Sequence, residues 1–254
     1  MCTILLAWRT VPGAPIVLAA NRDELLDRPS LPPRILSDQP LIAGGQDLVA
    51  GGTWLAVRAD GAVAAVTNRR SEFRDPERRS RGELPLALLQ TRGDDDAHAF
   101  LQHIQAHDYN PFNAMYVSAQ HAWVAEAHGD AMRLHTLEPG LHVLTVYDLD
   151  DRSRRKVEWL CERFALVARD TTPNDPAALL AAMEDILRDH GEPGRDGVDA
   201  VCVHLDRYGT VSSSSLIVAD DGAITYRHAP GKPDVTPHED YSALLAQPSS
   251  SGSG

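Results

Sequence analysis

The sequence predicts an α+β fold in which two largely antiparallel sheets carry layers of paired helices. Short apolar segments separated by turn residues predict hairpins, which join antiparallel strands. Two pairs of helical segments interrupt the strands, and this order favours helices packed as layers on two sheets. The chain has 254 residues, of which 43% are hydrophobic, so it can bury a core of normal size.

Apolar segments bounded by turn residues predict the strands. In chain order they are Cys2–Trp8, Ile16–Ala20, Trp54–Arg58, Val63–Thr67, Ala114–Ser118, Ala122–Ala127, Met132–Leu137, His142–Val146, Ala200–His204, Ser214–Ala219 and Ile224–His228. The first hairpin turns through Thr10–Pro15 and the second through Ala59–Gly61, both rich in turn residues. Between these hairpins, a segment with Pro29, Pro32, Pro33 and Pro40 is predicted to be a loop.

Four helices are predicted, at Glu83–Gln90, Asp94–His107, Asp151–Arg169 and Asp175–Arg188. The second opens with three aspartates, which suit the positive end of a helix. Apolar residues of the third recur on one face. The charged segment Asn68–Arg81 is expected to be a loop. Because no linker is evident within residues 1–240, we predict a single domain over 1–247, followed by a Ser/Gly linker over 248–254.

The cysteine at position two offers the most chemistry of any single residue. If Met1 is removed, Cys2 carries both a thiol nucleophile and a free α-amine. That amine has an ordinary pKa of about 7.7–8.0 and can serve as a general base near neutral pH. One residue would then supply both members of a catalytic pair. Position alone, however, favours a small apolar residue that starts a buried strand.

Composition excludes several kinds of partner. The formal net charge is −12 and the isoelectric point is about 5.3, whereas nucleic acids and anionic membranes attract basic surfaces. No apolar segment approaches the length of a membrane span, and no secretory signal is present. The three cysteines do not form a disulfide framework. We therefore expect a cytoplasmic protein with a small-molecule partner, and neither nucleic acid nor membrane.

Four motifs follow Cys2 in order, and with Cys2 as the fifth they resemble one known family. They are Asn21-Arg22-Asp23-Glu24, Ala50-Gly51-Gly52-Thr53-Trp54, Thr67-Asn68-Arg69 and Ser80-Arg81-Gly82-Glu83-Leu84, with Cys2 itself as the anchor. The chain resembles the NRDE family, also called the transport and Golgi organisation family. That family is similar to the N-terminal-nucleophile (Ntn) hydrolases. The resemblance implies a four-layer αββα sandwich, with two antiparallel sheets between helix layers.

The resemblance also implies a site around Cys2. In cysteine members, the processed N-terminal cysteine attacks an amide carbon, and an arginine and an aspartate just past the second strand surround it. Arg22 and Asp23 match those positions. Asp23 would orient the Cys2 amine, and Arg22 would favour the thiolate through its positive charge. Asn68 would donate to an oxyanion through its amide or its backbone N–H.

Other residues are predicted to bind the substrate or to support the site. Gly51 and Gly52 would let the backbone approach a ligand closely, and Trp54 would pack over it. Arg69 begins an arginine-rich segment that is either a solvated loop or an anion-binding rim for a substrate carboxylate. One position departs from the family pattern: Val146 stands where many members have an asparagine that would support the oxyanion.

We predict no metal site. His103 and His107 share a helix face at a spacing that can ligate metal, but no acidic ligand pattern accompanies them. Cys161 and Cys202 are expected to lie in the core. No G-x-S-x-G nucleophile motif is present.

Two functional hypotheses follow from the sequence. The first is a cysteine Ntn amidohydrolase that needs no cofactor: after Met1 removal, Cys2 attacks a small-molecule carbon–nitrogen amide. The second, also implied by the resemblance, is a non-catalytic haem-binding or trafficking protein that uses the same pocket. A fold relic with neither activity is the third and weaker alternative.

Overall fold

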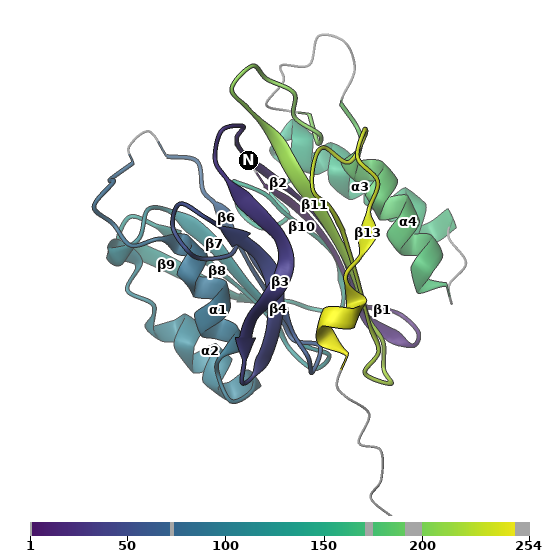
Figure 1. The fold of residues 1–254 in the computed structure, drawn as a ribbon, viewed down its shortest axis with the longest axis horizontal. Helices are drawn as coiled ribbons and strands as arrows, with labels where there is room; N and C mark the ends of the chain where they lie inside the picture. Colours follow the sequence, from purple (N-terminus) through teal and green to yellow (C-terminus); the bar gives the residue numbers. More distant parts are fainter. Residues whose placement is uncertain (1, 72–73, 171–174, 191–199, 247–254) are drawn as a thin grey trace, which may run out of the picture.

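Two antiparallel sheets lie face to face, and a pair of helices covers the outer face of each sheet in the computed structural model (Figure 1). Residues 2–71, 74–170, 175–190 and 200–246 are described. Met1 and the predicted linker at 248–254 lie outside the described residues. The layer order of helices, sheet, sheet and helices confirms the predicted αββα sandwich.

The first sheet contains the N-terminal strand, and we call it sheet A. Its strand order is β10-β1-β2-β11-β12-β13. The bounds are β1 Thr3–Val11, β2 Ala14–Leu25, β10 Gly140–Leu144, β11 Tyr208–Val218, β12 Ile224–Ala229 and β13 Glu239–Asp240. The first predicted hairpin is therefore present, and β2 continues through the whole Asn21–Glu24 motif. A long strand, β11, lies beside β2 along its full length.

The second sheet, called sheet B, consists of strands that follow one another in the chain. Its order is β3-β4-β5-β6-β7-β8-β9. The bounds are β3 Ser30–Asp38, β4 Leu41–Asp47, β5 Leu55–Arg58, β6 Val63–Asn68, β7 Phe112–Val117, β8 Ala122–His128 and β9 Ala131–Thr136. Between β5 and β6, Gly61 has a φ of +91°, which glycine adopts without strain.

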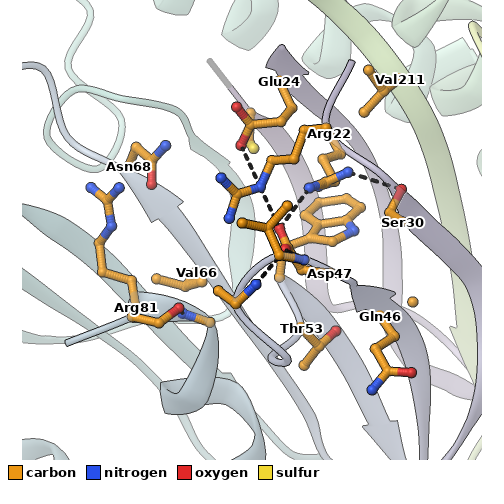
Figure 2. Close-up of a pocket in the computed structure, with 18 of the residues that line it drawn as sticks. Arg22, Glu24, Ser30, Gln46, Asp47, Thr53, Val66, Asn68, Arg81 and Val211 are labelled. Atoms are coloured by element: carbon orange, nitrogen blue, oxygen red, sulfur yellow. Dashed lines mark hydrogen bonds and ion pairs between the residues drawn. The ribbon is translucent and has the colours of Figure 1, made fainter. Parts of the chain in front are cut away.

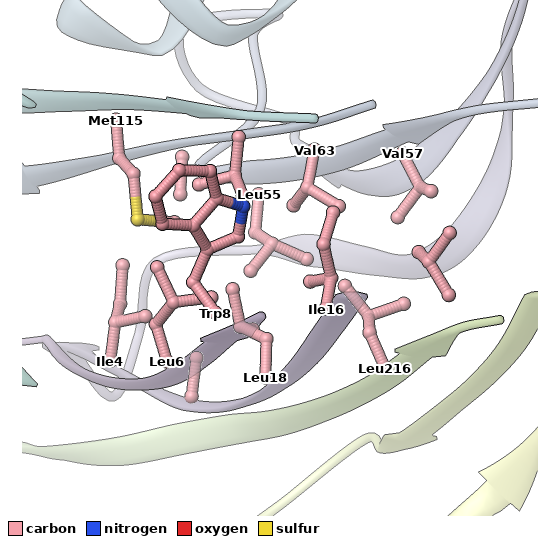
Figure 3. Close-up of a cluster of buried hydrophobic side chains, with 14 of the residues drawn as sticks. Ile4, Leu6, Trp8, Ile16, Leu18, Leu55, Val57, Val63, Met115 and Leu216 are labelled. Carbon is pink, nitrogen blue, oxygen red and sulfur yellow. The ribbon is translucent and has the colours of Figure 1, made fainter. Parts of the chain in front are cut away.

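Because side chains alternate along the strands, the core has three parts: one between the two sheets, one between sheet B and its helices, and one between sheet A and its helices. In β1, Ile4, Leu6 and Trp8 face sheet B (Figure 3). Leu5 and Ala7 face helices instead, because successive side chains of a strand point to opposite faces. The Trp8 indole N–H also donates to the carbonyl of Ser118 at 2.9 Å, and this bond ties the two sheets together. By the same alternation, Cys2 belongs to the face of sheet A that looks toward sheet B.

Helices α1 (Leu84–Leu89) and α2 (Asp94–His103) pack on sheet B, and α3 (Arg155–Asp170) and α4 (Pro176–Leu187) pack on sheet A. The described residues also form three short 3₁₀ helices: η1 Arg81–Glu83, η2 Ala106–Asp108 and η3 Ser242–Leu245. Helix α4 begins as its sequence predicts, because Asp175 caps the backbone N–H of Ala178 and Pro176 occupies the first turn. No helix among the described residues is long and apolar enough to cross a membrane.

Two sequence predictions about strands are wrong. The expected proline-rich loop contains the β3–β4 hairpin instead. Strand β3 tolerates Pro32 and Pro33 because it is an edge strand with a register irregularity between Leu31 and Arg34, where a missing N–H does not interrupt a ladder.

The predicted strand at 200–204 is absent, since that backbone finds other partners. The N–H groups of Val201 and Cys202 donate to the carbonyl of Asp189, and the N–H of Val203 donates to the Thr210 hydroxyl. Only an isolated bridge joins His204 to Gly209 within the described residues.

Candidate functional site

A cavity of about 340 Å³ opens where β1 begins, between the ends of the two sheets. Figure 2 shows side chains of β2, β3, β4 and η1 around it. Its wall includes Cys2, Arg22, Asp23, Trp54 and Asn68. The structure thus brings together the four predicted catalytic residues and one of the predicted substrate-binding residues.

Cys2 lies immediately before β1 and is 7% exposed. Burial raises the pKa of its thiol, and the backbone N–H of Asp23 and the charge of Arg22 oppose that rise only in part. The thiol is therefore the stable form here, and a nucleophilic thiolate needs a base close by. With Met1 still attached, the nitrogen of Cys2 is an amide and cannot be that base.

Arg22 has a structural role besides the electrostatic one expected for it. Its guanidinium donates to the Asp47 carboxylate at 3.0 Å and to the Ser30 hydroxyl at 3.1 Å (Figure 2). Arg28 donates to the same carboxylate oxygen at 2.6 Å. Arg22 therefore anchors the β3–β4 hairpin to β2 and forms one wall of the cavity, and its charge lowers the pKa of the Cys2 thiol less than burial raises it.

The Asp47 carboxylate is the centre of this anchor. Its second oxygen accepts the backbone N–H groups of Val49 and Ala50 at 2.9 and 3.0 Å. Burial opposes ionisation, but the hydrogen bonds from Arg28 and the backbone outweigh it and hold the pKa of Asp47 below its usual range. Asp47 is thus charged near neutral pH, and its negative charge neutralises one of the two positive charges of Arg22 and Arg28.

Asp23 is buried on the opposite side of β2 from Arg22. Its Oδ1 accepts the Thr210 hydroxyl at 2.6 Å, and its backbone carbonyl accepts the Tyr208 hydroxyl at 3.1 Å. Burial raises the pKa of Asp23, and the nearby Lys156 and the Thr210 hydrogen bond counteract this in part. A buried carboxylate beside the start of β1 is well placed to stabilise a positive charge that appears there.

The remaining two residues of the 21–24 motif have structural roles. The buried amide of Asn21 donates to the carbonyls of Leu187 and Val201 at 2.8 and 3.1 Å, which joins sheet A to the end of α4. Glu24 lies at the cavity edge, 3.7 Å from the Arg28 guanidinium. The motif therefore places alternate residues on opposite faces of β2, as a strand requires.

Asn68 and Arg81 both line the cavity on its sheet B side, and both are labelled in Figure 2. Asn68 ends β6. One nitrogen of Arg81 donates to the carbonyl of Pro111 at 2.9 Å, and within the described residues its guanidinium has no carboxylate partner. Burial lowers the pKa of Arg81 to about 10, so it remains a cation near neutral pH.

Three predicted substrate-binding residues lie outside the wall of this cavity. Gly51 and Gly52 border a separate hollow near α1 and α2. A Cβ on Gly52 would stand 2.4 Å from the carbonyl oxygen of Gly82, so this glycine allows two backbones to pack rather than a ligand to approach. Arg69 forms an ion pair with Asp148 and donates to Asn113 at 2.7 Å. The structure therefore does not bring these three residues to the cavity that contains Cys2.

Val146 is buried and follows the end of β10. The β1–β10 register pairs Ile4 with Leu144, and continuing it by two residues sets Val146 opposite Cys2. The backbone of this segment is held by the Asn113 amide, which donates to the carbonyls of Thr145 and Tyr147, both at 2.9 Å. An apolar side chain thus occupies the position where the family pattern has an amide.

Three contributors to the site were missed by the sequence interpretation. Asp47 and Thr210 carry no motif, and their importance depends on pairing between distant strands. Arg81 was grouped with a solvated arginine-rich segment, although it belongs to one of the five family-like motifs, Ser80–Leu84. That membership was the available signal.

The fold is that of the Ntn hydrolases. Similar solved structures include a mutant of the conjugated bile acid hydrolase from Clostridium perfringens, with a TM-score of 0.60 and 11% identity over 98% of this chain and 95% of that chain. A second is the Caenorhabditis elegans N-acylethanolamine-hydrolyzing acid amidase ortholog, with a TM-score of 0.53 and 11% identity over 85% of this chain and 92% of that one. At this identity the likeness concerns the fold.

The chain belongs to the Transport and Golgi organisation 2 family, whose model matches residues 1–229. The Bos taurus Transport and Golgi organization protein 2 homolog is 31% identical over 239 residues, and the Homo sapiens homolog is 29% identical over 244 residues. Each alignment covers 83% of this chain and 84% of the relative. The predicted family is thereby confirmed.

Proposed function

We propose that this protein is a cysteine Ntn hydrolase that cleaves a carbon–nitrogen amide bond in a small molecule once Met1 has been removed. The single observation that carries this proposal is the placement of Cys2 in the cavity wall with the buried carboxylate of Asp23. This arrangement gives a nucleophile and a counter-charge for a new N-terminal ammonium in one place.

Removal of Met1 would change the electrostatics of the site. The Cys2 nitrogen would become an amine that can accept the thiol proton, and Asp23 would stabilise the resulting ammonium. The thiolate would then attack the amide carbon and form a tetrahedral oxyanion. Collapse of that intermediate would break the carbon–nitrogen bond as the ammonium returns its proton to the leaving amine. Water, deprotonated by the same amine, would hydrolyse the thioester to a carboxylic acid and regenerate Cys2.

The oxyanion would be stabilised from the sheet B side. Val146 has no side-chain amide, so we assign the donors to Asn68, as expected from the sequence, and to Arg81, which lines the same cavity. A cation that is partly withdrawn from water stabilises a developing negative charge more strongly than an exposed one. This pair replaces the donor that the family pattern would place at position 146.

The cavity rim favours a substrate with a carboxylate. Arg22 and Arg28 share Asp47, and Arg79 pairs with Glu83 at 2.7 Å. Arg74 also lines the cavity and, like Arg81, has no acidic partner within the described residues. Guanidinium groups bind carboxylates through paired hydrogen bonds, so N-acyl amino acids are the first compounds to screen.

The test is hydrolysis of a panel of N-acyl amides by protein whose intact mass lacks Met1. We expect Cys2→Ala to abolish turnover, and Cys161→Ala, which removes another buried thiol, to retain it. Turnover by Cys2→Ala equal to that of the wild type would refute the mechanism.

Haem handling is the second candidate, because Cys2 and His228 both line the cavity and both side-chain types ligate haem iron. His228 is 3% exposed, and its Nδ1 is hydrogen-bonded to the Ser214 hydroxyl at 2.8 Å. Titration with hemin should give a saturable Soret band that shifts in Cys2→Ala or His228→Asn if this candidate is correct. A spectrum unaffected by both substitutions would contradict it.

A further inference from the structure

Four side chains of metal-ligating type gather away from the Cys2 cavity. They are His190, Cys202, His204 and Asp234, and we call them the metal-ligand cluster. Each residue offers one potential ligand atom, and these four atoms all lie within 4.8 Å of one another. None of the four lines the cavity that contains Cys2, so the proposed amidohydrolase chemistry leaves this cluster unexplained.

Three separate segments supply the cluster. His190 comes just after α4, Cys202 and His204 come from the segment before β11, and Asp234 comes from the turn after β12. Backbone bonds fix these segments: the N–H of Cys202 donates to the carbonyl of Asp189 at 2.8 Å, and the N–H of Thr236 donates to the carbonyl of Lys232 at 2.8 Å. The ligands therefore do not depend on a single flexible loop.

The spacing of the ligand atoms suits one small ion. The Cys202 sulfur lies 3.5 Å from Nε2 of His204 and 3.3 Å from Oδ1 of Asp234. Oδ2 of Asp234 lies 3.2 Å from Nε2 of His190 and 3.4 Å from Nε2 of His204. Tetrahedral coordination with metal–ligand distances of about 2.0–2.3 Å separates ligand atoms by about 3.3–3.7 Å. These four contacts, of 3.2–3.5 Å, lie close to those separations, although they use both oxygens of Asp234. All four ligand atoms lie within 4.8 Å of one another, so the side chains need to close only slightly around an ion.

The donor types select the class of metal. One thiolate, two imidazoles and one carboxylate form a borderline-soft set, which suits Zn²⁺ and related first-row ions rather than Mg²⁺ or Ca²⁺. Cys202 is fully buried, whereas His190 and His204 are exposed, so an ion can enter from solvent on the histidine side. Lys232 contacts Nδ1 of His204 at 3.2 Å, and its flexible side chain must move when an ion binds.

We propose that His190, Cys202, His204 and Asp234 form a structural Zn²⁺ site. Binding would release the thiol proton that Cys202 now directs at Asp234, because a coordinating thiol is deprotonated. With all four positions filled by protein, the ion would have no open position for a substrate. Its role would be to tie the end of α4 to the segments on either side of β11 and β12.

A Zn²⁺ ion bound to the metal-ligand cluster would also support the candidate site. Val203, between the two ligands Cys202 and His204, donates its N–H to the Thr210 hydroxyl, and that hydroxyl donates to Asp23. Metal binding would therefore restrain the partner of the buried carboxylate. The metal site itself stands independently of the proposed hydrolase activity.

The experiment is Zn²⁺ titration of the full chain after chelator treatment, read by competition with a chromophoric chelator, with Co²⁺ absorption as the second readout. We expect about one equivalent of Zn²⁺ per chain and a higher unfolding temperature with metal than without. Co²⁺ should show tetrahedral visible bands and a thiolate charge-transfer band.

Cys202→Ser should lower Zn²⁺ affinity by at least about tenfold, which is the cost of disturbing even an outer partner of a metal site, and should remove the charge-transfer band. Asp234→Asn tests the site if Cys202→Ser fails to fold. Matched controls are Cys161→Ser and His103→Ala, a cysteine and a histidine outside the cluster, and both should leave metal binding unchanged. Binding of less than one Zn²⁺ per chain would overturn the proposal. So would a Zn²⁺ affinity equal to that of the wild type in both Cys202→Ser and Asp234→Asn.

Discussion

The substitution Thr210→Val tests most directly whether the Thr210 hydroxyl holds Asp23 in place, because it changes little else in the fold. Thr210 is fully buried, and its hydroxyl has two partners at once: it donates to Asp23 at 2.6 Å and accepts the N–H of Val203 at 2.9 Å. Valine has nearly the same shape but forms neither bond. The substitution should therefore act through lost hydrogen bonds and not through a cavity.

The expected cost follows from these two bonds. A hydrogen bond to a charged group contributes about 1.5–3 kcal/mol, and a buried N–H left without a partner costs about 1–3 kcal/mol. Together they predict a loss of about 2.5–6 kcal/mol in the free energy of unfolding. That is a large fraction of the total stability of about 5–15 kcal/mol expected for a domain.

Urea unfolding followed by far-UV circular dichroism measures this loss. Thr225→Val on β12 is the matched control, because within the described residues its hydroxyl has no hydrogen bond, and it should change stability by less than about 0.5 kcal/mol. If Thr210→Val costs no more than Thr225→Val, then Thr210 does not hold Asp23 and the description of this side of the site is wrong.

Three further substitutions test other parts of the account. Asn68→Ala should lower kcat on an active substrate by about 10²–10³-fold, the usual cost of losing an oxyanion donor, and an effect within threefold would remove Asn68 from that role. Asp47→Asn should cost about 2 kcal/mol in urea unfolding because it leaves Arg22 short of its counter-charge, whereas Asp170→Asn, an exposed pair member, should cost less than about 0.5 kcal/mol. Burial lowers the pKa of His228 to about 4 from 6.5. The unfolded chain therefore takes up a proton first as pH falls, and between pH 7 and pH 5 the wild type should lose about 2 kcal/mol more stability than His228→Asn. Equal losses would show that His228 is not shielded from water.

The fold was predictable because its signals are local. The hairpins around Thr10–Pro15 and Ala59–Gly61 follow from apolar alternation and turn residues, and α4 follows from Asp175 and Pro176. The β3–β4 hairpin was missed because Pro32 and Pro33 argue against a strand unless its place at a sheet edge is known. The segment at 200–204 was mistaken for a strand because its apolar residues pack beneath α4 while its N–H groups bond to Asp189 and Thr210.

The candidate site was predictable only where motifs carried it. Cys2, Arg22, Asp23 and Asn68 belong to recognisable motifs and do meet in one cavity. The roles within that cavity depend on distant pairings that no motif records. Arg22 is drawn to Asp47, 25 positions along the chain, and Asp23 is held by Thr210, 187 positions along. Residues so far apart have no local signal, and the metal-ligand cluster is hidden for the same reason.

The central claim is that Cys2 becomes an N-terminal nucleophile, and intact mass combined with thiol labelling tests it directly. The active protein should have lost the mass of Met1, and a substrate-like electrophile should add a single label that peptide mapping places on Cys2. That label should fail to form when Met1 is retained, because the blocked nitrogen cannot take the thiol proton. An active protein that keeps Met1, or one that labels at Cys161 or Cys202 while Cys2 stays unmodified, would contradict the account.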